Sequence, residues 1–148
     1  MQRKLSTAAD QALRAAGWYP GRDISSLVAD WFAHLCDSSM FAAFPEARRV
    51  LSEFGDITVT SLFAGVDYAP GKIVLDPVLA LGEQDRFESF EDDAGSRLFP
   101  LGEIYGGHAF LAIGESGRLF MVGDDLTLLG DSFEEGISNL IEGRRFSK

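Results

Sequence analysis

The spacing of apolar residues changes near the middle of this chain, and this change constrains the possible folds more than any single motif does. Over residues 5–54 apolar side chains recur at steps of three and four, which is the period of a helix with one buried face. From Ile57 onward they fall in short runs separated by Gly, Pro and Asp, which is typical of strands and turns. Helices followed by strands predict an α+β domain with an antiparallel sheet.

Three helices are predicted in the first half of the chain. The first ends at Gly17, a residue type suited to the C-terminal end of a helix. The second covers residues 24–36, and the side chain of Asp23 before it can accept from the free amides of its first turn. The third begins at Pro45, a favoured first-turn residue, and stops before Gly55. Together these helices would cover one face of a sheet.

Six short strands are predicted in the second half, at residues 57–60, 72–75, 96–105, 108–113, 118–122 and 126–129. Pro100 interrupts the third strand, which indicates a sheet edge or a bulge. The turn at residues 114–117 predicts an antiparallel hairpin. A last helix begins with a capping box formed by Ser132 and Glu135. Residues 83–95, where the composition shifts, are interpreted as a helix end or an inserted loop.

Length and charge narrow the possible functions. The chain of 148 residues matches a single domain, residues 1–148, in which N-terminal helices pack on a mainly antiparallel meander with a C-terminal helix. Lys and Arg number 13 and Asp and Glu number 23, so the net charge is −10 with neutral His. This charge disfavours nucleic acid and anionic membranes as partners and favours basic proteins or cations. No signal peptide and no membrane span of ~20 apolar residues is found, so a cytoplasmic protein is expected.

The residue types that perform most enzyme chemistry are scarce. Cys36 is the only thiol, so an internal disulfide is impossible, and it lies on the apolar stripe of its predicted helix. His34 is two residues away on the same helix and points elsewhere, and His108 begins a predicted strand. One Cys and two His also cannot build a usual zinc site. We therefore expect no enzyme activity, no metal and no cofactor. A hydrolase that uses the carboxylates of Glu103 and Asp124 is kept as an alternative.

The most distinctive feature is an acidic segment between Glu83 and Asp93. It holds six carboxylates and one arginine in eleven residues, with Phe87 and Phe90 among them. Aromatic contacts inside a charged rim are typical of surfaces that bind proteins. The alternative is that both rings dock on the core and the acids only face water. The residues predicted to bind a partner, including acids near strand ends, are Asp85, Glu88, Phe90, Glu91, Asp92, Asp93, Glu103, Asp124 and Asp125.

A short segment between the first two helices is predicted to form a fixed corner. Gly17 lets the chain turn, Trp18 covers the core, and Pro20 with Gly21 forms a turn. Arg22 could pair with Asp23 or with another acid, an interaction worth little if it is exposed. These residues are interpreted as structural.

Several segments occur in a recognisable order along nearly the whole chain. The most specific is Leu13–Arg22, with its Ala-Gly-Trp-x-Pro-Gly-Arg run. The others are Phe44–Ala47, Leu51–Gly55, Leu101–Glu103, Gly117–Phe120, Gly130–Ile137 and Leu140–Gly143. In this order they are similar to the SUKH superfamily of bacterial immunity proteins, and to its third family in particular. Asp56 departs from the family pattern, which often has a second glycine at this position.

The resemblance implies an α+β fold and a role as a cytoplasmic antidote. Members of the superfamily are thought to bind and neutralise toxins exchanged between bacteria, and many such toxins are nucleases or deaminases. The resemblance brings no shared set of catalytic residues. The resemblance implies a cognate toxin domain as the partner. The acidity of this chain fits a toxin with a basic surface, since toxins that attack nucleic acid commonly carry basic grooves. A regulatory or scaffold module of the same fold, which binds other proteins in the cell, is the alternative function.

Overall fold

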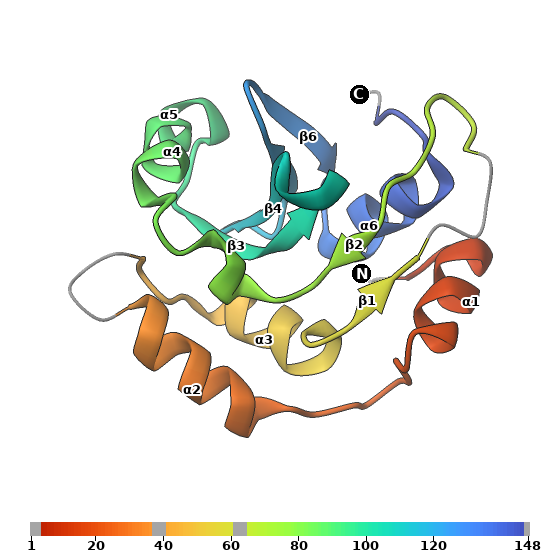
Figure 1. Cartoon of the computed structure of the whole chain (residues 1–148), viewed down its shortest axis with the longest axis horizontal. Coiled ribbons are helices and arrows are strands. Elements are labelled where there is room, and N and C mark those ends of the chain that lie inside the picture. The colour runs from red at the N-terminus through yellow and green to blue at the C-terminus, as the bar shows by residue number, and fades with distance from the viewer. Residues whose placement is uncertain (1–3, 37–40, 61–64, 147–148) are drawn as a thin grey trace.

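The first third of the chain is helical, as the spacing of its apolar residues predicts. The computed structural model describes residues 4–36, 41–60 and 65–146. In it, α1 spans Thr7–Ala15, α2 spans Ser25–Leu35 and α3 spans Pro45–Phe54 (Figure 1). The Ser6 hydroxyl caps α1 by accepting from the Ala9 amide at 3.1 Å, and the Asp23 carboxylate accepts from the Ser25 amide at 2.8 Å. That hydrogen bond lowers the pKa of Asp23.

Six antiparallel strands follow one another in chain order and form a meander. They are β1 (Thr58–Val59), β2 (Ile73–Val74), β3 (Leu98–Ile104), β4 (Ala109–Gly114), β5 (Leu119–Val122) and β6 (Leu126–Gly130). All six lie within or overlap the predicted ranges. The interruption at Pro100 is a bulge, because the register of β3 against β4 shifts between Pro100 and Gly102. Since β3 lies inside the sheet, the alternative of a sheet edge at Pro100 is wrong.

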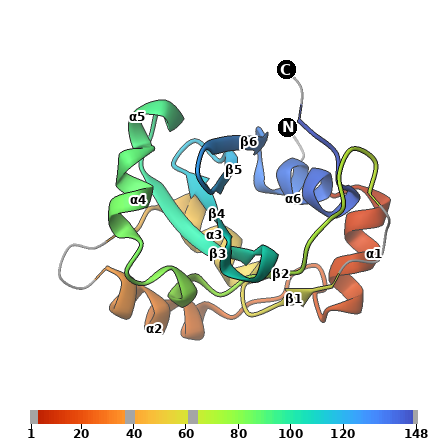
Figure 2. The ribbon, with the colours of Figure 1, turned by 45° about the horizontal axis from the view of Figure 1, so that its top comes forward.

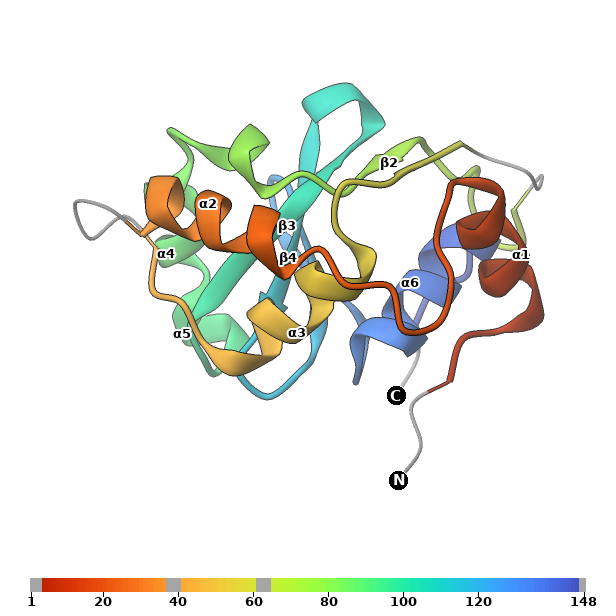
Figure 3. The same cartoon turned by 90° about the horizontal axis from the view of Figure 1, so that it is seen from below.

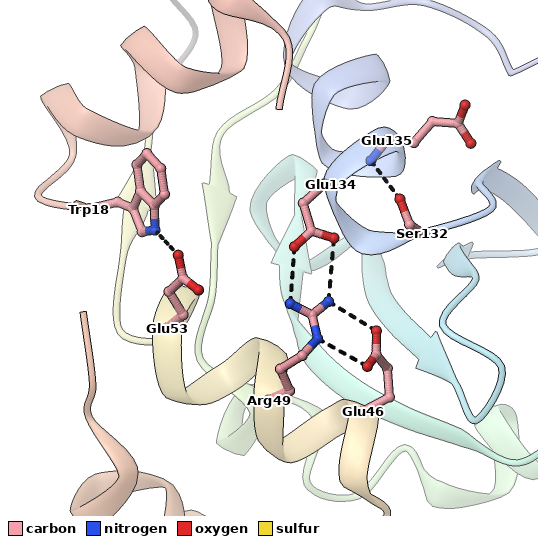
Figure 4. Close-up of polar contacts among 7 residues, drawn as sticks. All are labelled: Trp18, Glu46, Arg49, Glu53, Ser132, Glu134 and Glu135. Carbon is pink, nitrogen blue, oxygen red and sulfur yellow. Dashed lines mark hydrogen bonds and ion pairs between the residues drawn. The ribbon is translucent and has the colours of Figure 1, made fainter. Parts of the chain in front are cut away.

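The chain closes with α6 (Phe133–Glu142), whose start is the predicted cap in modified form. The Ser132 hydroxyl accepts from the Glu135 amide at 3.1 Å (Figure 4). The Glu135 carboxylate accepts from the Asp131 amide at 2.7 Å, one residue before the position that a capping box uses. Gly143 ends the helix in the left-handed conformation.

One face of the sheet is covered by α2, α3 and α6, and the main core lies between these two layers. Seen from below, α2 and α3 lie in front of β3 and β4 (Figure 3), and α6 packs against β5 and β6. The ring of Phe99 on β3 lies 4.8 Å from that of Phe32 and 6.2 Å from that of Phe44, measured between centroids. The helix α6 approaches β5 so closely that a Cβ atom on Gly136 would lie 2.6 Å from the Leu119 Cβ.

The opposite face of the sheet is partly covered by α4 (Gln84–Ser89) and α5 (Glu91–Ala94), which stand beside β3 (Figure 2). Phe87 of α4 is buried, and its ring centroid lies 6.0 Å from that of Phe110 on β4 and 5.5 Å from that of Phe41. The interpretation of residues 83–95 as a helix end or an inserted loop is therefore wrong, because a buried aromatic ring holds two short helices there. The described residues also include two 3-10 turns, η2 (Pro77–Ala80) and η3 (Tyr105–Gly107).

Candidate partner-binding surface

The acidic segment that was predicted to bind a partner forms α4 and α5. Glu91 is half-buried, and its carboxylate accepts from the Leu98 amide at 2.9 Å, so it helps to hold α5 against β3. Glu83 pairs with Arg86 at 3.4 Å. Four carboxylates are exposed and have no partner among the described residues: Asp85, Glu88, Asp92 and Asp93. This part of the surface therefore carries a concentrated, uncompensated negative charge.

A hollow of about 390 Å³ brings part of the predicted set together. It lies between α5 and the strands β5 and β6, and its lining includes Phe90, Asp93 and Asp125. These residues are far apart in the sequence, yet they meet because the β5–β6 turn returns the chain to the side of α5. Asp124 is exposed beside Asp125 in the same turn. We name the exposed carboxylates Asp85, Glu88, Asp92, Asp93, Asp124 and Asp125 the acidic surface.

Glu103 does not belong to the lining of this hollow. It is half-buried on β3, opposite Phe110 of β4, whereas Asp124 follows β5. Strands that are two apart in a sheet lie about 10 Å from each other. The side chain of Asp124 is also exposed. A hydrolase would need Glu103 and Asp124 in one enclosed cleft, and their placement gives that alternative no support.

The two histidines and the cysteine lie outside the acidic surface. His34 and His108 are exposed, while Cys36 is half-buried at the end of α2, where burial raises the pKa of its thiol. Within residues 4–36, 41–60 and 65–146, no group of three or more His, Cys, Asp or Glu side chains could hold a metal ion. In the same residues, none of the helices has the length and apolar character needed to cross a membrane.

The predicted corner after α1 is built around Trp18. This residue is buried, and its ring stacks on that of Phe54 with centroids 5.5 Å apart and planes at 9°. Its Nε1 donates to Glu53 Oε2 at 3.0 Å (Figure 4). The Arg14 guanidinium lies 5.2 Å above the Trp18 ring. Trp18 therefore joins the end of α1 to α3.

Arg22 has a different role from the one expected. Its guanidinium donates to the carbonyl oxygens of Glu53 at 2.9 Å and Gly55 at 2.7 Å. It thus satisfies carbonyls that the end of α3 leaves free, and among the described residues it forms no ion pair with Asp23 or another acid. Gly17 and Gly21 have φ values of 110° and 82°, which only glycine adopts readily, and Pro20 lies exposed between them.

A partly buried ion cluster centred on Arg49 was not predicted. Arg49 on α3 binds Glu46 of the same helix and Glu134 of α6, each at 3.0 Å (Figure 4). Burial alone would lower the pKa of Arg49, but the hydrogen bonds that its guanidinium donates to the two carboxylates outweigh burial and raise the pKa. The three-residue spacing of Glu46 and Arg49 was a signal in the sequence. Nothing local indicated Glu134, because its contact with Arg49 depends on how the helices pack.

Comparison with known proteins identifies the class of protein to which this acidic α+β domain belongs. A family model matches residues 5–143 and makes the chain an immunity protein of the SUKH superfamily. Within that superfamily, the chain belongs to the family described as SUKH-3 immunity protein. The resemblance seen in the sequence is thereby confirmed, and the family implies immunity against a toxin. No curated protein and no solved structure matches the chain.

Proposed function

We propose that this protein neutralises a cognate toxin in the cytoplasm by covering it with the acidic surface. The toxin is a basic domain, and a nuclease or a deaminase is the class that fits, because such domains use cationic grooves to hold nucleic acid. The observation that supports this proposal is the set of four exposed carboxylates on α4 and α5 without partners among the described residues. The family supplies the general role, and the surface charge supplies the kind of partner.

Charge and shape contribute separately to such a complex. Uncompensated carboxylates attract a cationic partner from a distance and orient it before contact. The hollow beside α5 then offers apolar surface from Phe90, Phe120 and Leu126 that a close contact can bury. Inhibition of this kind requires no bond to be made or broken, because an occluded active site is closed to its substrate. It therefore needs no catalytic group on this protein.

The test combines growth rescue with binding kinetics. A toxin domain found in a neighbouring reading frame is co-expressed with the wild-type protein, with the double variant Asp92→Lys, Asp93→Lys, or with the triple variant Asp30→Lys, Gln11→Lys, Ala33→Lys as a control. The control makes the same change in net charge at exposed positions on α2 and α1 that have no ion pair among the described residues. We expect the Asp92→Lys, Asp93→Lys variant to lose rescue and to slow association by about tenfold or more, and the control to do neither.

Salt provides a second measurement on the same complex. Raising the ionic strength from 0.01 to 0.15 M shortens the Debye length from about 30 Å to about 8 Å, so the association rate should fall steeply. Equal losses in both charge variants, or an association rate that ignores salt, would contradict the role of the acidic surface. A protein that rescues no growth and instead binds several cellular proteins is the scaffold module that was the alternative.

A further inference from the structure

The strand β6 lies at the end of the sheet, and among the described residues only β5 pairs with it. The strand order runs from β1 to β6, so no other strand in the described residues lies beyond β6. In an antiparallel pair, half of the peptide groups of an edge strand point away from its neighbour. Asn139 Nδ2 donates to the Leu129 carbonyl at 2.8 Å and thereby covers one end of β6. The open edge is therefore Leu126–Leu128, and it lies on the side of the molecule opposite α2 (Figure 1).

Hollows flank this edge on both faces of the sheet. The first is the hollow of about 390 Å³ described above, to which Leu126 and Leu128 contribute. The second has a volume of about 400 Å³, and Thr127 and Leu129 contribute to it. Leu128 borders both. Successive side chains of a strand point to opposite faces, so a strand added beside β6 would place its side chains alternately over the two hollows.

The two hollows have different chemistry. The first combines the apolar side chains of Phe90 and Phe120 with the carboxylates of Asp93 and Asp125. Arg118 also borders it, but this guanidinium lies 3.5 Å from Asp131. A Lys or Arg side chain suits such a site, since its stem is apolar and its end is cationic.

The second hollow is lined by aromatic and other apolar residues. Tyr68, Tyr105 and Phe146 contribute rings to it, and Met121 contributes a flexible apolar side chain. Tyr68 and Tyr105 are half-buried, so their rings are available to a side chain that enters. Arg144 and Arg145 also border this hollow, which disfavours a basic side chain there. An apolar side chain therefore suits it.

We propose that an extended segment of the partner, with alternating basic and apolar side chains, pairs with β6 as a seventh strand of the sheet. Main-chain hydrogen bonds along β6 would supply affinity, and the two hollows would select the alternating pattern. The identification of the partner as a toxin rests on the proposed function. The pattern itself follows from the charge and lining of the two hollows. A second copy that paired through its own β6 is a poorer occupant, because that strand, Leu126–Gly130, has no basic side chain to place over the first hollow.

Synthetic peptides of eight residues test the pairing without any toxin. The first alternates Lys and Val, and the second contains the same residues as a Lys block followed by a Val block. Two further peptides alternate Lys and Val but carry N-methyl groups on all the Lys amides or on all the Val amides. Each carries a fluorescent label, and binding to the unmodified protein is measured by anisotropy. In an extended peptide the amides of alternate residues point to the same side, so only the Lys amides or only the Val amides can face β6. N-methylation of the set that faces β6 should weaken binding by about tenfold or more, and N-methylation of the other set should not.

The block peptide should also bind about tenfold more weakly than the alternating one, since it cannot place basic and apolar side chains on opposite faces. In the complex with the alternating peptide, those amides of Leu126–Leu128 that point away from β5 should gain protection from hydrogen exchange. Asp93→Asn with Asp125→Asn should weaken binding, and Asp30→Asn should not. The pairing would be overturned if the two N-methylated peptides bound equally, or if the block peptide bound as tightly as the alternating one. It would also be overturned if the alternating peptide did not bind at all.

Toxin binding by the wild-type protein and by the Asp92→Lys, Asp93→Lys variant is measured in parallel. A toxin complex that depends on these charges, together with failure of the peptide tests, would remove the strand pairing and leave the proposed function standing. If the peptides pair with β6 as expected but the protein neither binds nor neutralises a toxin, the strand pairing stands and the proposed function is overturned. Dimerisation of the free protein, checked by sedimentation, would show that β6 is taken by a second copy, and this too would overturn the proposal.

Discussion

Asp56 adopts a φ of 58°, in the left-handed region, directly after the end of α3. Its amide donates to the Leu75 carbonyl at 2.7 Å, so this turn aligns the start of the sheet with the helix. At this position the chain departs from the glycine that the family often carries, and the structure shows why a glycine fits there. Aspartate tolerates the left-handed region better than most residues, which is how the departure is accommodated.

The backbone of Asp56 leads to a prediction about stability. The free energy of unfolding of Asp56→Gly should exceed that of Asp56→Ala by about 1 kcal/mol. Alanine has a Cβ atom that is sterically disfavoured in the left-handed region, and glycine has none. Urea denaturation of the two variants measures this difference. Equal stabilities, or a more stable alanine variant, would show that the turn relaxes to another conformation.

The raised pKa of Tyr68 leads us to expect that stability depends on pH in the alkaline range. Burial, with Tyr105 and Asp67 nearby, raises the pKa of Tyr68 to about 12, above the value of about 10 expected in the unfolded chain. Between pH 10 and 12 the folded state therefore holds the phenolic proton more tightly, so the free energy of unfolding should fall as the pH rises through this range. Tyr68→Phe removes this titration and should flatten the slope in denaturant unfolding at pH 9, 10 and 11. An unchanged slope would contradict the assignment to Tyr68.

Helices α3 and α6 are distant in the sequence, and Arg49 connects them. Its side chain is about one-third exposed, whereas those of Glu46 and Glu134 are 13% and 9% exposed. A charged hydrogen bond is worth more when its partners are shielded from water, and a buried carboxylate that loses its cation is costly. The cluster therefore favours the observed packing of α3 beside α6 over other arrangements of the same helices.

Removal of the Arg49 guanidinium should weaken this packing. Arg49→Met is expected to lower the free energy of unfolding by about 2 kcal/mol, since it leaves two carboxylates facing each other without a cation. Arg49→Lys should lie between this variant and the wild type, because lysine keeps the charge but cannot bind both carboxylates in the same planar way. Arg86→Met, which removes an exposed pair with Glu83, is the control and should cost within about 0.5 kcal/mol. Equal costs for Arg49→Met and Arg86→Met would contradict a stabilising role for the cluster.

Elements with a regular pattern could be predicted from the sequence, and elements held by one contact could not. The cap at Ser132, the proline at position 45 and the apolar spacing indicated in the sequence where helices begin and which side they bury, whereas the cap at Ser6 was not predicted. The helices α4 and α5 are too short to show a period, and a single ring, Phe87, holds them. The contribution of Arg22 to the end of α3 was also missed, because its acceptors are carbonyls 31 and 33 positions away.

At the scale of the whole molecule, the net charge of −10 acts on folding and on binding in opposite ways. Repulsion among the carboxylates opposes the compact state, while the same charges attract a basic partner. The excess of acid and its segment at residues 83–93 were visible in the sequence. The meeting of Asp93 with Asp125, and the open edge of β6 between two hollows, depend on strand order and could only be seen in the fold.

These opposite effects predict opposite responses to salt. As sodium chloride rises from about 0.02 to 0.3 M, screening should raise the thermal midpoint of the free protein. Over the same range the association rate with a basic partner should fall. Calorimetry of the free protein and stopped-flow mixing of the complex measure the two quantities. A midpoint that falls with salt would mean that local ion pairs, such as Arg97 with Glu115 at 2.8 Å, outweigh the general repulsion.

The meander has a consequence for synthesis on the ribosome. Because each strand pairs with the next one along the chain, most of the sheet can form as the polypeptide emerges, without waiting for distant segments. The contact between α1 and α6 is the exception, because α6 follows every strand of the sheet along the chain and the Ser6 amide meets the Ser138 hydroxyl at 3.0 Å only after α6 has been made. A nascent chain therefore leaves the side of α1 that faces α6 uncovered until that helix emerges, so any product truncated before α6 exposes an apolar surface to cellular proteases.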